Sequence, residues 1–204
     1  MYLTKLEMPL HSRWAAGALA DCQRMHRLVS NLFGDGRKEQ NVLYRVRVLR
    51  GAVQLYLYSA ATPTHIPEEI TVVGQRDLTQ WLEELREEQF WGFDLLTMPF
   101  KKEGRAAQGQ RSQRRVLREP EERLRWLRRK GEQNGFEIVE VQELEQSKVQ
   151  GRHGQDRGGS MYWDVLHYQG VLRITDAERF RTAVETGIGP GKAYGLGMLM
   201  LQRR

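Results

Sequence analysis

The first half of the chain has four segments whose hydrophobic positions follow the spacing of a strand or a helix. Alternating polar and apolar residues in MYLTKLEM (residues 1–8) predict a short strand. Apolar residues three and four positions apart predict one helix over 15–34. Two β-rich runs joined by an Arg-Gly pair predict a hairpin within 41–60, and 77–89 has the pattern of a second amphipathic helix. This half therefore has the order strand, helix, strand, strand, helix, without an evident closing strand.

The second half repeats this order and completes it. Its predicted elements are a strand at 90–100, a helix at 119–135, strands at 136–146 and 162–175, a helix at 176–187 and a terminal strand at 194–201. Asp176 is suited to cap the last helix and Gly187 to end it. Strand, helix, strand, strand, helix, strand is the order of the ferredoxin-like fold. The sequence thus predicts the α+β class, with two tandem ferredoxin-like (RRM-like) domains at 1–88 and 89–204.

Two polar segments, 101–115 and 147–160, interrupt the second half and are rich in Gly, Gln, Lys and Arg. One interpretation is that both are solvated loops. The other is that both are basic arms that fold on a polyanion, the second at the tip of an extended β-hairpin. The candidate contacts of these arms are Lys101, Lys102 and Arg105 in the first, and Arg152 and Arg157 in the second.

Composition narrows the class of partner. The 204 residues include 32 Lys and Arg against 26 Asp and Glu, which gives a formal charge of +6 and favours a polyanion over an acidic partner. The single cysteine, Cys22, excludes an intramolecular disulfide and a cysteine-cluster zinc site. No apolar run approaches the roughly 20 residues of a membrane span, and the amino end lacks a signal-peptide pattern. We therefore expect a cytoplasmic protein with no membrane partner.

The segment VETGIGPGKAYGLGMLMLQRR at the carboxyl end (184–204) is dense in glycine. Its glycines at 187, 189, 191, 195 and 197 surround one lysine, Lys192, and fit neither G-x-G-x-x-G nor the P-loop motif. The segment leaves a helix and enters a strand, which is the reverse of a nucleotide-binding loop, so no nucleotide cofactor is expected. It is either a helix stop with a wide turn, or a loop whose backbone N–H groups approach an anion closely.

His26 is the histidine best placed for proton transfer. RNA carries its own nucleophile, the 2′-hydroxyl, so cleavage of RNA requires proton transfer and charge compensation but no metal. On a helical projection His26 lies at the margin of the apolar stripe of its helix, where it can be half-buried and still reach a cleft. The alternative is a boundary histidine packed beneath a neighbouring element. His167 alternates with apolar residues in a strand, which favours a structural role or a surface contact.

Five segments, in chain order, resemble the CasE family, the CRISPR RNA-processing endoribonucleases of the type I-E Cascade complex. They are MYLTKLEM, MHRLVSNLF, FDLLTMPFKKEGR, RLRWLRRKGEQNGF and, most specifically, GIGPGKAYGLGMLML. The resemblance implies two ferredoxin-like domains and metal-independent cleavage at the base of the repeat hairpin, with no cofactor. It also implies two kinds of partner: the CRISPR repeat RNA hairpin and the other Cascade subunits.

Carried over to single positions, the resemblance assigns the family's catalytic histidine to His26. The family tyrosine three residues earlier corresponds to Gln23, which can hydrogen-bond a phosphate or a ribose but does not exchange a proton. The basic segment 148–160 would enter the major groove of the RNA hairpin. The loop 187–192 would present the backbone N–H groups of Gly187, Gly189 and Gly191, together with the side chain of Lys192, to RNA phosphates.

Two other functions compete with this one. A non-catalytic RNA-binding subunit would have the same fold, because fold alone does not determine activity. A single cut in a repeat RNA incubated with excess protein in EDTA would distinguish the endoribonuclease from that subunit. A nucleotide-binding regulator is disfavoured because the chain has no phosphate-loop motif.

Overall fold

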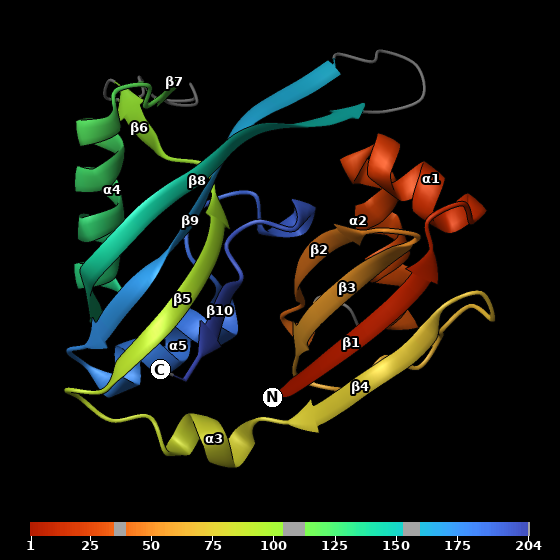
Figure 1. Ribbon diagram of the computed structural model, residues 1–204, viewed down its shortest axis with the longest axis horizontal. Helices are drawn as coiled ribbons and strands as arrows, with labels where there is room; N and C mark the ends of the chain where they lie inside the picture. Colours follow the sequence, from red (N-terminus) through yellow and green to blue (C-terminus); the bar gives the residue numbers. More distant parts are fainter. Residues whose placement is uncertain (35–39, 104–112, 153–159, 204) are drawn as a thin grey trace, which may run out of the picture.

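The computed structural model describes residues 1–34, 40–103, 113–152 and 160–203. It places them in two four-stranded antiparallel sheets that lie side by side (Figure 1). The first sheet has the order β2-β3-β1-β4, and the second has the order β10-β5-β9-β8. The two orders are the same when the first sheet is read from β4 and the second from β10: the closing strand comes first, followed by the first, third and second strands of the repeat. The strands of the first sheet are β1 (Tyr2–Pro9), β2 (Leu43–Leu49), β3 (Ala52–Ser59) and β4 (Thr71–Asp77).

The second sheet carries its helices on one face and an inserted hairpin. Its elements are β5 (Phe90–Thr97), α4 (Pro120–Gln133), β8 (Phe136–Arg152), β9 (Ser160–Ile174), α5 (Ala177–Thr186) and β10 (Leu199–Gln202). A small hairpin, β6 (Phe100–Glu103) with β7 (Gln113–Val116), lies between β5 and α4. Both sheets thus confirm the α+β, tandem ferredoxin-like prediction.

The prediction of one helix over 15–34 is wrong. The segment forms two helices, α1 (Arg13–Ala20) and α2 (Cys22–Asn31), separated by Asp21 in an extended conformation. The Asp21 carboxylate accepts a hydrogen bond from the Gln23 backbone N–H at 2.8 Å, so it caps the second helix. Aspartate competes for backbone N–H groups in this way and favours helix starts over helix interiors. The break places Gln23 and His26 in the first turns of a new helix.

The prediction of a helix over 77–89 is also wrong, and a strand was missed. Residues 71–77 form β4, which closes the first sheet by pairing with β1, and only Thr79–Glu83 (α3) is helical. Every side chain of β4 is exposed, so the strand carries no alternating apolar signal. The apolar residues at 78–85 instead pack into the core of the second sheet; the buried ones are Leu78, Leu82 and Leu85. Their spacing reflects tertiary contacts and not a long helix.

The remaining elements agree with prediction more closely. Asp176 caps α5 through the Arg179 N–H, and Gly187 ends the helix at φ 77°. β8 and β9 pair out to Arg152 and Ser160, so much of the segment predicted as a basic arm is a β-hairpin. Its outer end lies beside α1 and α2 (Figure 1). The terminal strand is shorter than predicted, because a 3₁₀ turn, Lys192–Tyr194, precedes it.

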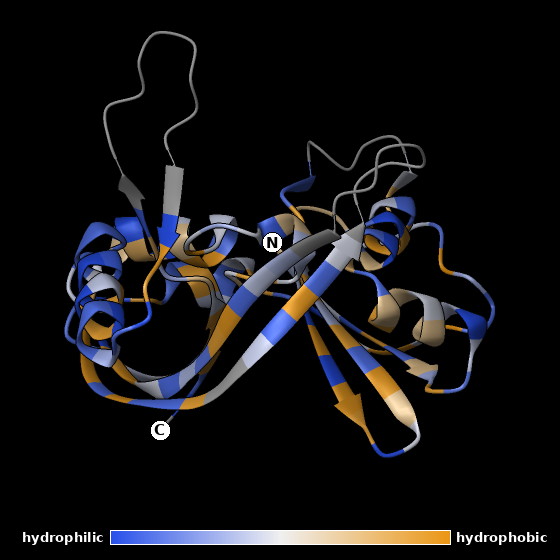
Figure 2. Ribbon diagram, turned by 90° about the horizontal axis from the view of Figure 1, so that it is seen from above, coloured by the Kyte–Doolittle hydropathy of each residue, from blue (hydrophilic) through white to orange (hydrophobic). Residues whose placement is uncertain are grey.

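A buried ion network joins the two sheets where they meet. Arg45 of β2 lies 2.7 Å from an Asp94 carboxylate oxygen of β5, and only 4% of the Arg45 side chain is exposed. His167 and Gln169 of β9 contact the other oxygen of Asp94 at 3.0 and 2.7 Å. Of the two roles predicted for His167, the structure therefore favours the structural one. Figure 2 shows the two sheets inclined toward each other, with the β8–β9 hairpin extending across from the second domain.

Within the described ranges, no helix is long and apolar enough to span a membrane.

Candidate active site

The glycine-rich loop is shaped by backbone conformations that only glycine adopts readily. Its glycines at 187, 189, 191, 195 and 197 all have φ between 77° and 80°. At Gly195 a Cβ would lie 2.9 Å from a ring carbon of Tyr44, and at Gly189 it would lie 2.8 Å from the Thr97 hydroxyl. The loop therefore runs against β2 of the first sheet and β5 of the second with no space for side chains at these positions. The density of glycine has a packing cause as well as any binding role.

Several backbone groups of the loop bond within the protein. The Gly187 N–H donates to Ala183, the Ile188 N–H to Gly197, and the Gly197 N–H to Leu96. The Gly187 N–H that we expected to face an RNA phosphate is thus the cap of α5, and this residue is buried. Gly187 contributes to the position of the loop. The hydrogen bonds hold the loop in one shape before any ligand arrives.

His26 is held against this loop by its imidazole. Its Nδ1 lies 2.9 Å from the carbonyl oxygen of Ala193, 167 residues away in the sequence. The Tyr44 hydroxyl donates to the same oxygen at 3.0 Å. A carbonyl oxygen only accepts, so Nδ1 carries the proton and Nε2 holds the lone pair of the neutral ring. His26 is half-buried, as its helical position predicts, and its tautomer suits Nε2 for proton abstraction.

Tyr194 adjoins His26 and was not among the residues predicted from the sequence. Its ring centroid lies 5.7 Å from that of His26 and 4.4 Å from that of Trp163. The side-chain amide of Gln23 donates to the Tyr194 hydroxyl oxygen at 2.8 Å. Gln23, which was predicted to contact RNA, thus donates its side-chain N–H to a hydroxyl group of the protein itself. No sequence spacing connects position 194 with positions 23 and 26, because only the tertiary fold brings the loop to α2.

A basic cavity of about 740 Å³ lies on another side of the loop, between the loop, β6 and α4. Its lining includes Lys192 and Lys101, both predicted, and Arg129 and Lys130, which were missed. In the described part of the chain none of these four cations forms an ion pair, and no carboxylate lines the cavity. Partial burial and then repulsion from Lys130 lower the pKa of Lys192. Positive charges crowded in this way favour an anion between them.

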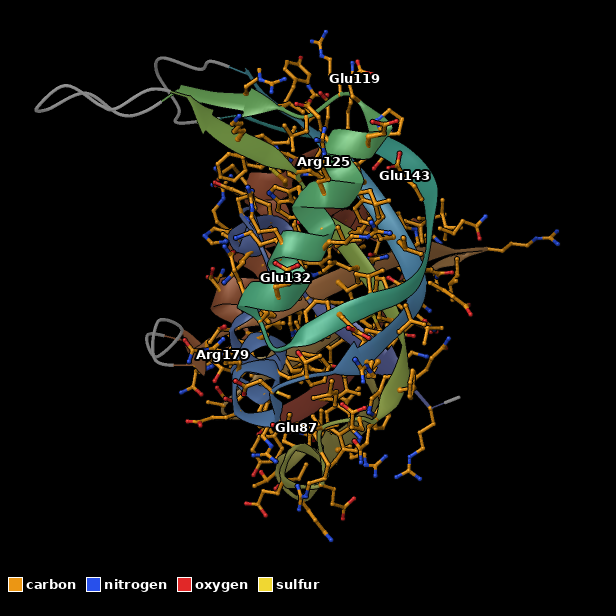
Figure 3. All side chains as sticks on the ribbon, turned by 90° about the vertical axis from the view of Figure 1, so that its left-hand side faces the viewer. Glu87, Glu119, Arg125, Glu132, Glu143 and Arg179 are labelled. Atoms are coloured by element: carbon orange, nitrogen blue, oxygen red, sulfur yellow. The ribbon has the colours of Figure 1, made fainter. Side chains whose placement is uncertain are left out.

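The outer face of α4 has a different character. In Figure 3, which looks onto this helix, the labelled residues Glu119, Arg125 and Glu132 follow one another with charges of opposite sign. Arg125 and Glu132 are exposed. Arg125 is not among the α4 residues that line the basic cavity, which are Trp126, Arg129 and Lys130.

A second cavity, of about 420 Å³, lies between α1, α2, β2 and β8. Its lining includes Tyr194, Tyr44 and Cys22, and Lys148 and Gln150 of β8. Burial, and then the charge of Asp21, raise the pKa of the Cys22 thiol to about 11, so the thiol remains protonated. Pockets of about 300–1,000 Å³ accommodate small ligands, so this one is large enough for a single nucleotide.

The other predicted contacts divide into two groups. Lys102 lies in β6 and Arg152 at the end of β8, so their backbones are placed on the two hairpins. Arg105 and Arg157 lie outside the described residues. Gly189 lines the basic cavity together with Lys192, whereas Gly191 is not among the residues that line it. In the ranges that the structure describes, no group of three or more His, Cys, Asp or Glu side chains could hold a metal ion.

These features define a tandem ferredoxin-like protein with a histidine oriented by a glycine-rich loop and an adjoining basic cavity. The chain belongs to the CRISPR associated protein family, whose model matches residues 1–203. It is 30% identical over 213 residues to the CRISPR-associated endoribonuclease Cse3 of Thermus thermophilus, with 98% of each chain covered.

Solved structures agree with this placement. Thermus thermophilus Cse3 bound to an RNA representing a pre-cleavage complex matches with a TM-score of 0.83 and 29% identity, over 99% of this chain and 98% of that one. The CRISPR-associated protein Cas6e from Escherichia coli matches with a TM-score of 0.75 and 24% identity, over 98% of each chain. The second likeness supports the fold alone.

Proposed function

We propose that this protein is a CRISPR-associated endoribonuclease that binds the hairpin of the CRISPR repeat and cleaves precursor CRISPR RNA. The single observation that carries the proposal is the hydrogen bond between His26 Nδ1 and the Ala193 carbonyl, at 2.9 Å. It orients a histidine at the junction of α2 and the glycine-rich loop and sets its tautomer. The similarity to Cse3, an endoribonuclease solved with RNA, supports the same reaction class here.

The proposed reaction uses the nucleophile that RNA supplies. His26 Nε2 accepts the proton of the 2′-hydroxyl, and the 2′-oxygen attacks the adjacent phosphorus. The bond from phosphorus to the 5′-oxygen then breaks, and the leaving 5′-oxygen takes up a proton from water, while the imidazolium of His26 returns its proton to the solvent. The products are a 2′,3′-cyclic phosphate on the upstream RNA and a 5′-hydroxyl on the downstream RNA. The Ala193 carbonyl stabilises the imidazolium that forms, because it accepts from the opposite ring nitrogen.

The basic cavity is the proposed site for RNA backbone phosphates. Four cations, Lys192, Lys130, Lys101 and Arg129, line this cavity, and cationic side chains of this kind bind RNA phosphates. The two hairpins, β6–β7 and β8–β9, extend from the same domain with Lys102 and Arg152 on their strands. We propose that these two β-hairpins hold the RNA hairpin. These contacts position the RNA and do not read its sequence.

Removal of cavity lysines should weaken RNA binding in a salt-dependent way. Lys192→Ala and Lys130→Ala are each expected to lower the slope of log affinity against log salt by about 0.7 to 0.9, because one phosphate contact and its released counterions are lost. Fluorescence anisotropy with a labelled repeat hairpin, across a salt series, measures the slope. Arg125→Ala on the outer face of α4 removes the same charge from the same helix and should leave the slope unchanged. Equal slopes for all three variants would contradict the assignment of the cavity to phosphates.

The cleavage itself has a direct test. A labelled repeat RNA incubated with excess protein in EDTA should be cut once, to give a cyclic phosphate end, because the mechanism requires only proton transfer and charge stabilisation. Strict dependence on added Mg²⁺ would contradict this mechanism. Tight binding without any cut, with and without Mg²⁺, would favour a non-catalytic RNA-binding subunit.

Three further assignments follow from the family. We propose the cytoplasm as the location, and the other Cascade subunits as partners that hold the protein together with its mature RNA. We also propose a division into two domains, 1–88 and 89–204, with the histidine in the first and the basic surfaces in the second. The residues at 78–85 belong to the first domain by position, although they pack on the second.

A further inference from the structure

We infer that Tyr194 is a further catalytic residue, whose hydroxyl donates a hydrogen bond to the scissile phosphate of the RNA. The inference rests on the proposed function and adds a residue to its site. It starts from one turn of the chain, Lys192–Tyr194, which supplies two neighbouring contacts to α2. The Ala193 carbonyl accepts from His26, and the Tyr194 hydroxyl accepts from Gln23.

The geometry of α2 makes these two contacts a unit. Gln23 and His26 are three residues apart, so they lie on the same side of the helix, one turn from each other. Both reach the same turn of the loop, at 2.8 and 2.9 Å. The Tyr194 ring is also fixed between His26, at 5.7 Å, and Trp163, at 4.4 Å. An RNA strand that brings a ribose 2′-hydroxyl to His26 therefore places the adjacent phosphate beside the Tyr194 hydroxyl, which is already oriented.

The polarity of the Gln23 contact determines what this hydroxyl can do. The amide N–H of Gln23 donates, so the Tyr194 oxygen accepts and its own hydrogen points to another partner. Among the described residues no acceptor takes that hydrogen. Tyr194 also lines the 420 Å³ cavity between α1, α2 and β8, which is large enough for a nucleotide. The RNA phosphate is the acceptor that fits, since charge develops on its oxygens in the transition state.

Gln23 acts through Tyr194 in this arrangement. It is a positioning residue, because its amide contacts the tyrosine hydroxyl and orients the remaining hydrogen. This gives a physical reason for an amide at position 23, where a side chain that only donates and accepts hydrogen bonds is sufficient.

The test is the single-turnover rate of repeat cleavage at saturating protein. Tyr194→Phe keeps the ring between His26 and Trp163 and removes only the hydroxyl; it should slow cleavage about 100-fold, the effect of removing one donor to a developing oxyanion, with hairpin affinity within about threefold. Gln23→Ala should cost about tenfold or less. The double variant should be no slower than Tyr194→Phe alone, because both changes remove one interaction. Tyr56→Phe, whose hydroxyl donates to Gln54 within the first sheet, is the matched control and should cleave at the parent rate.

Each outcome has a distinct meaning. A parent protein that binds the repeat but does not cut it would overturn the proposed function, and this inference with it. A parent that cuts, with a Tyr194→Phe variant that cuts at the same rate, would overturn the role of Tyr194 alone. A fully additive loss in the double variant would overturn the link between Gln23 and Tyr194.

Discussion

Replacement of His26 with alanine is expected to abolish cleavage of the repeat RNA while leaving hairpin affinity within about tenfold, roughly 1.4 kcal/mol. The imidazole is the proposed acceptor of the 2′-hydroxyl proton, and loss of a general base typically costs about 10² to 10⁴ in rate. The fold should persist, because the Ala193 carbonyl that His26 contacts still receives the Tyr44 hydroxyl.

Single-turnover cleavage and anisotropy binding on the same RNA separate these two effects. His65→Ala is the matched control, because His65 is an exposed histidine that bonds its neighbour Thr64. It should cleave like the parent. Full cleavage by His26→Ala would rule out the assignment of His26, whereas a joint loss of cleavage and of affinity would mean that His26 mainly holds the RNA.

Replacement of Asp94 with alanine is expected to destabilise the protein by about 3–5 kcal/mol, because a buried cation loses its counterion. Arg45 is 4% exposed, and its guanidinium lies 2.7 Å from the Asp94 carboxylate across the junction of the two sheets. Burial lowers the pKa of Arg45 to about 10, so it remains charged at neutral pH and would be left uncompensated. Urea unfolding, followed by tryptophan fluorescence, measures the loss.

Arg47→Ala provides the control within the same network. Its guanidinium lies 3.5 Å from Asp94, but 43% of its side chain is exposed, so solvent screens the pair and removal should cost about 1 kcal/mol or less. A loss of about 1 kcal/mol or less for Asp94→Ala, as small as the loss expected for Arg47→Ala, would show that the buried Arg45–Asp94 pair contributes little to joining the sheets.

The contribution of Asp94 should also depend on pH in a defined direction. Burial alone would raise the pKa of Asp94, but Arg45, with hydrogen bonds from Gln169 and His167, outweighs burial and holds the pKa below the ordinary 3.8. A carboxyl with a lower pKa in the folded chain stabilises the fold above the unfolded value and loses that effect as pH falls through the folded value. The difference in stability between the parent and Asp94→Ala should therefore shrink below pH 3.8.

The sequence by itself determined the elements that carry a strong periodic signal or a local cap. The α5 helix with Asp176 and Gly187, the α4 helix and the strands around Gly51 all lie where their patterns predict. These elements are local: apolar spacing, capping oxygens and left-handed glycines act within a few residues. The same local logic placed His26 at a half-buried helix margin. It could also have located the break at Asp21, since an aspartate inside an apolar pattern signals a helix start.

The tertiary structure alone decided the parts that depend on contacts between distant segments. β4 is a strand because it pairs with the edge of β1, and its side chains, all exposed, have no hydrophobic pattern that predicts this pairing. Tyr194 joins the site because the loop crosses to α2, where Gln23 meets its hydroxyl. Arg129 and Lys130 become part of one cavity with Lys192 because α4 packs beside the loop. Hydrophobic periodicity specifies which face of an element is buried, but only packing specifies against which partner, and the candidate site is made of such partners.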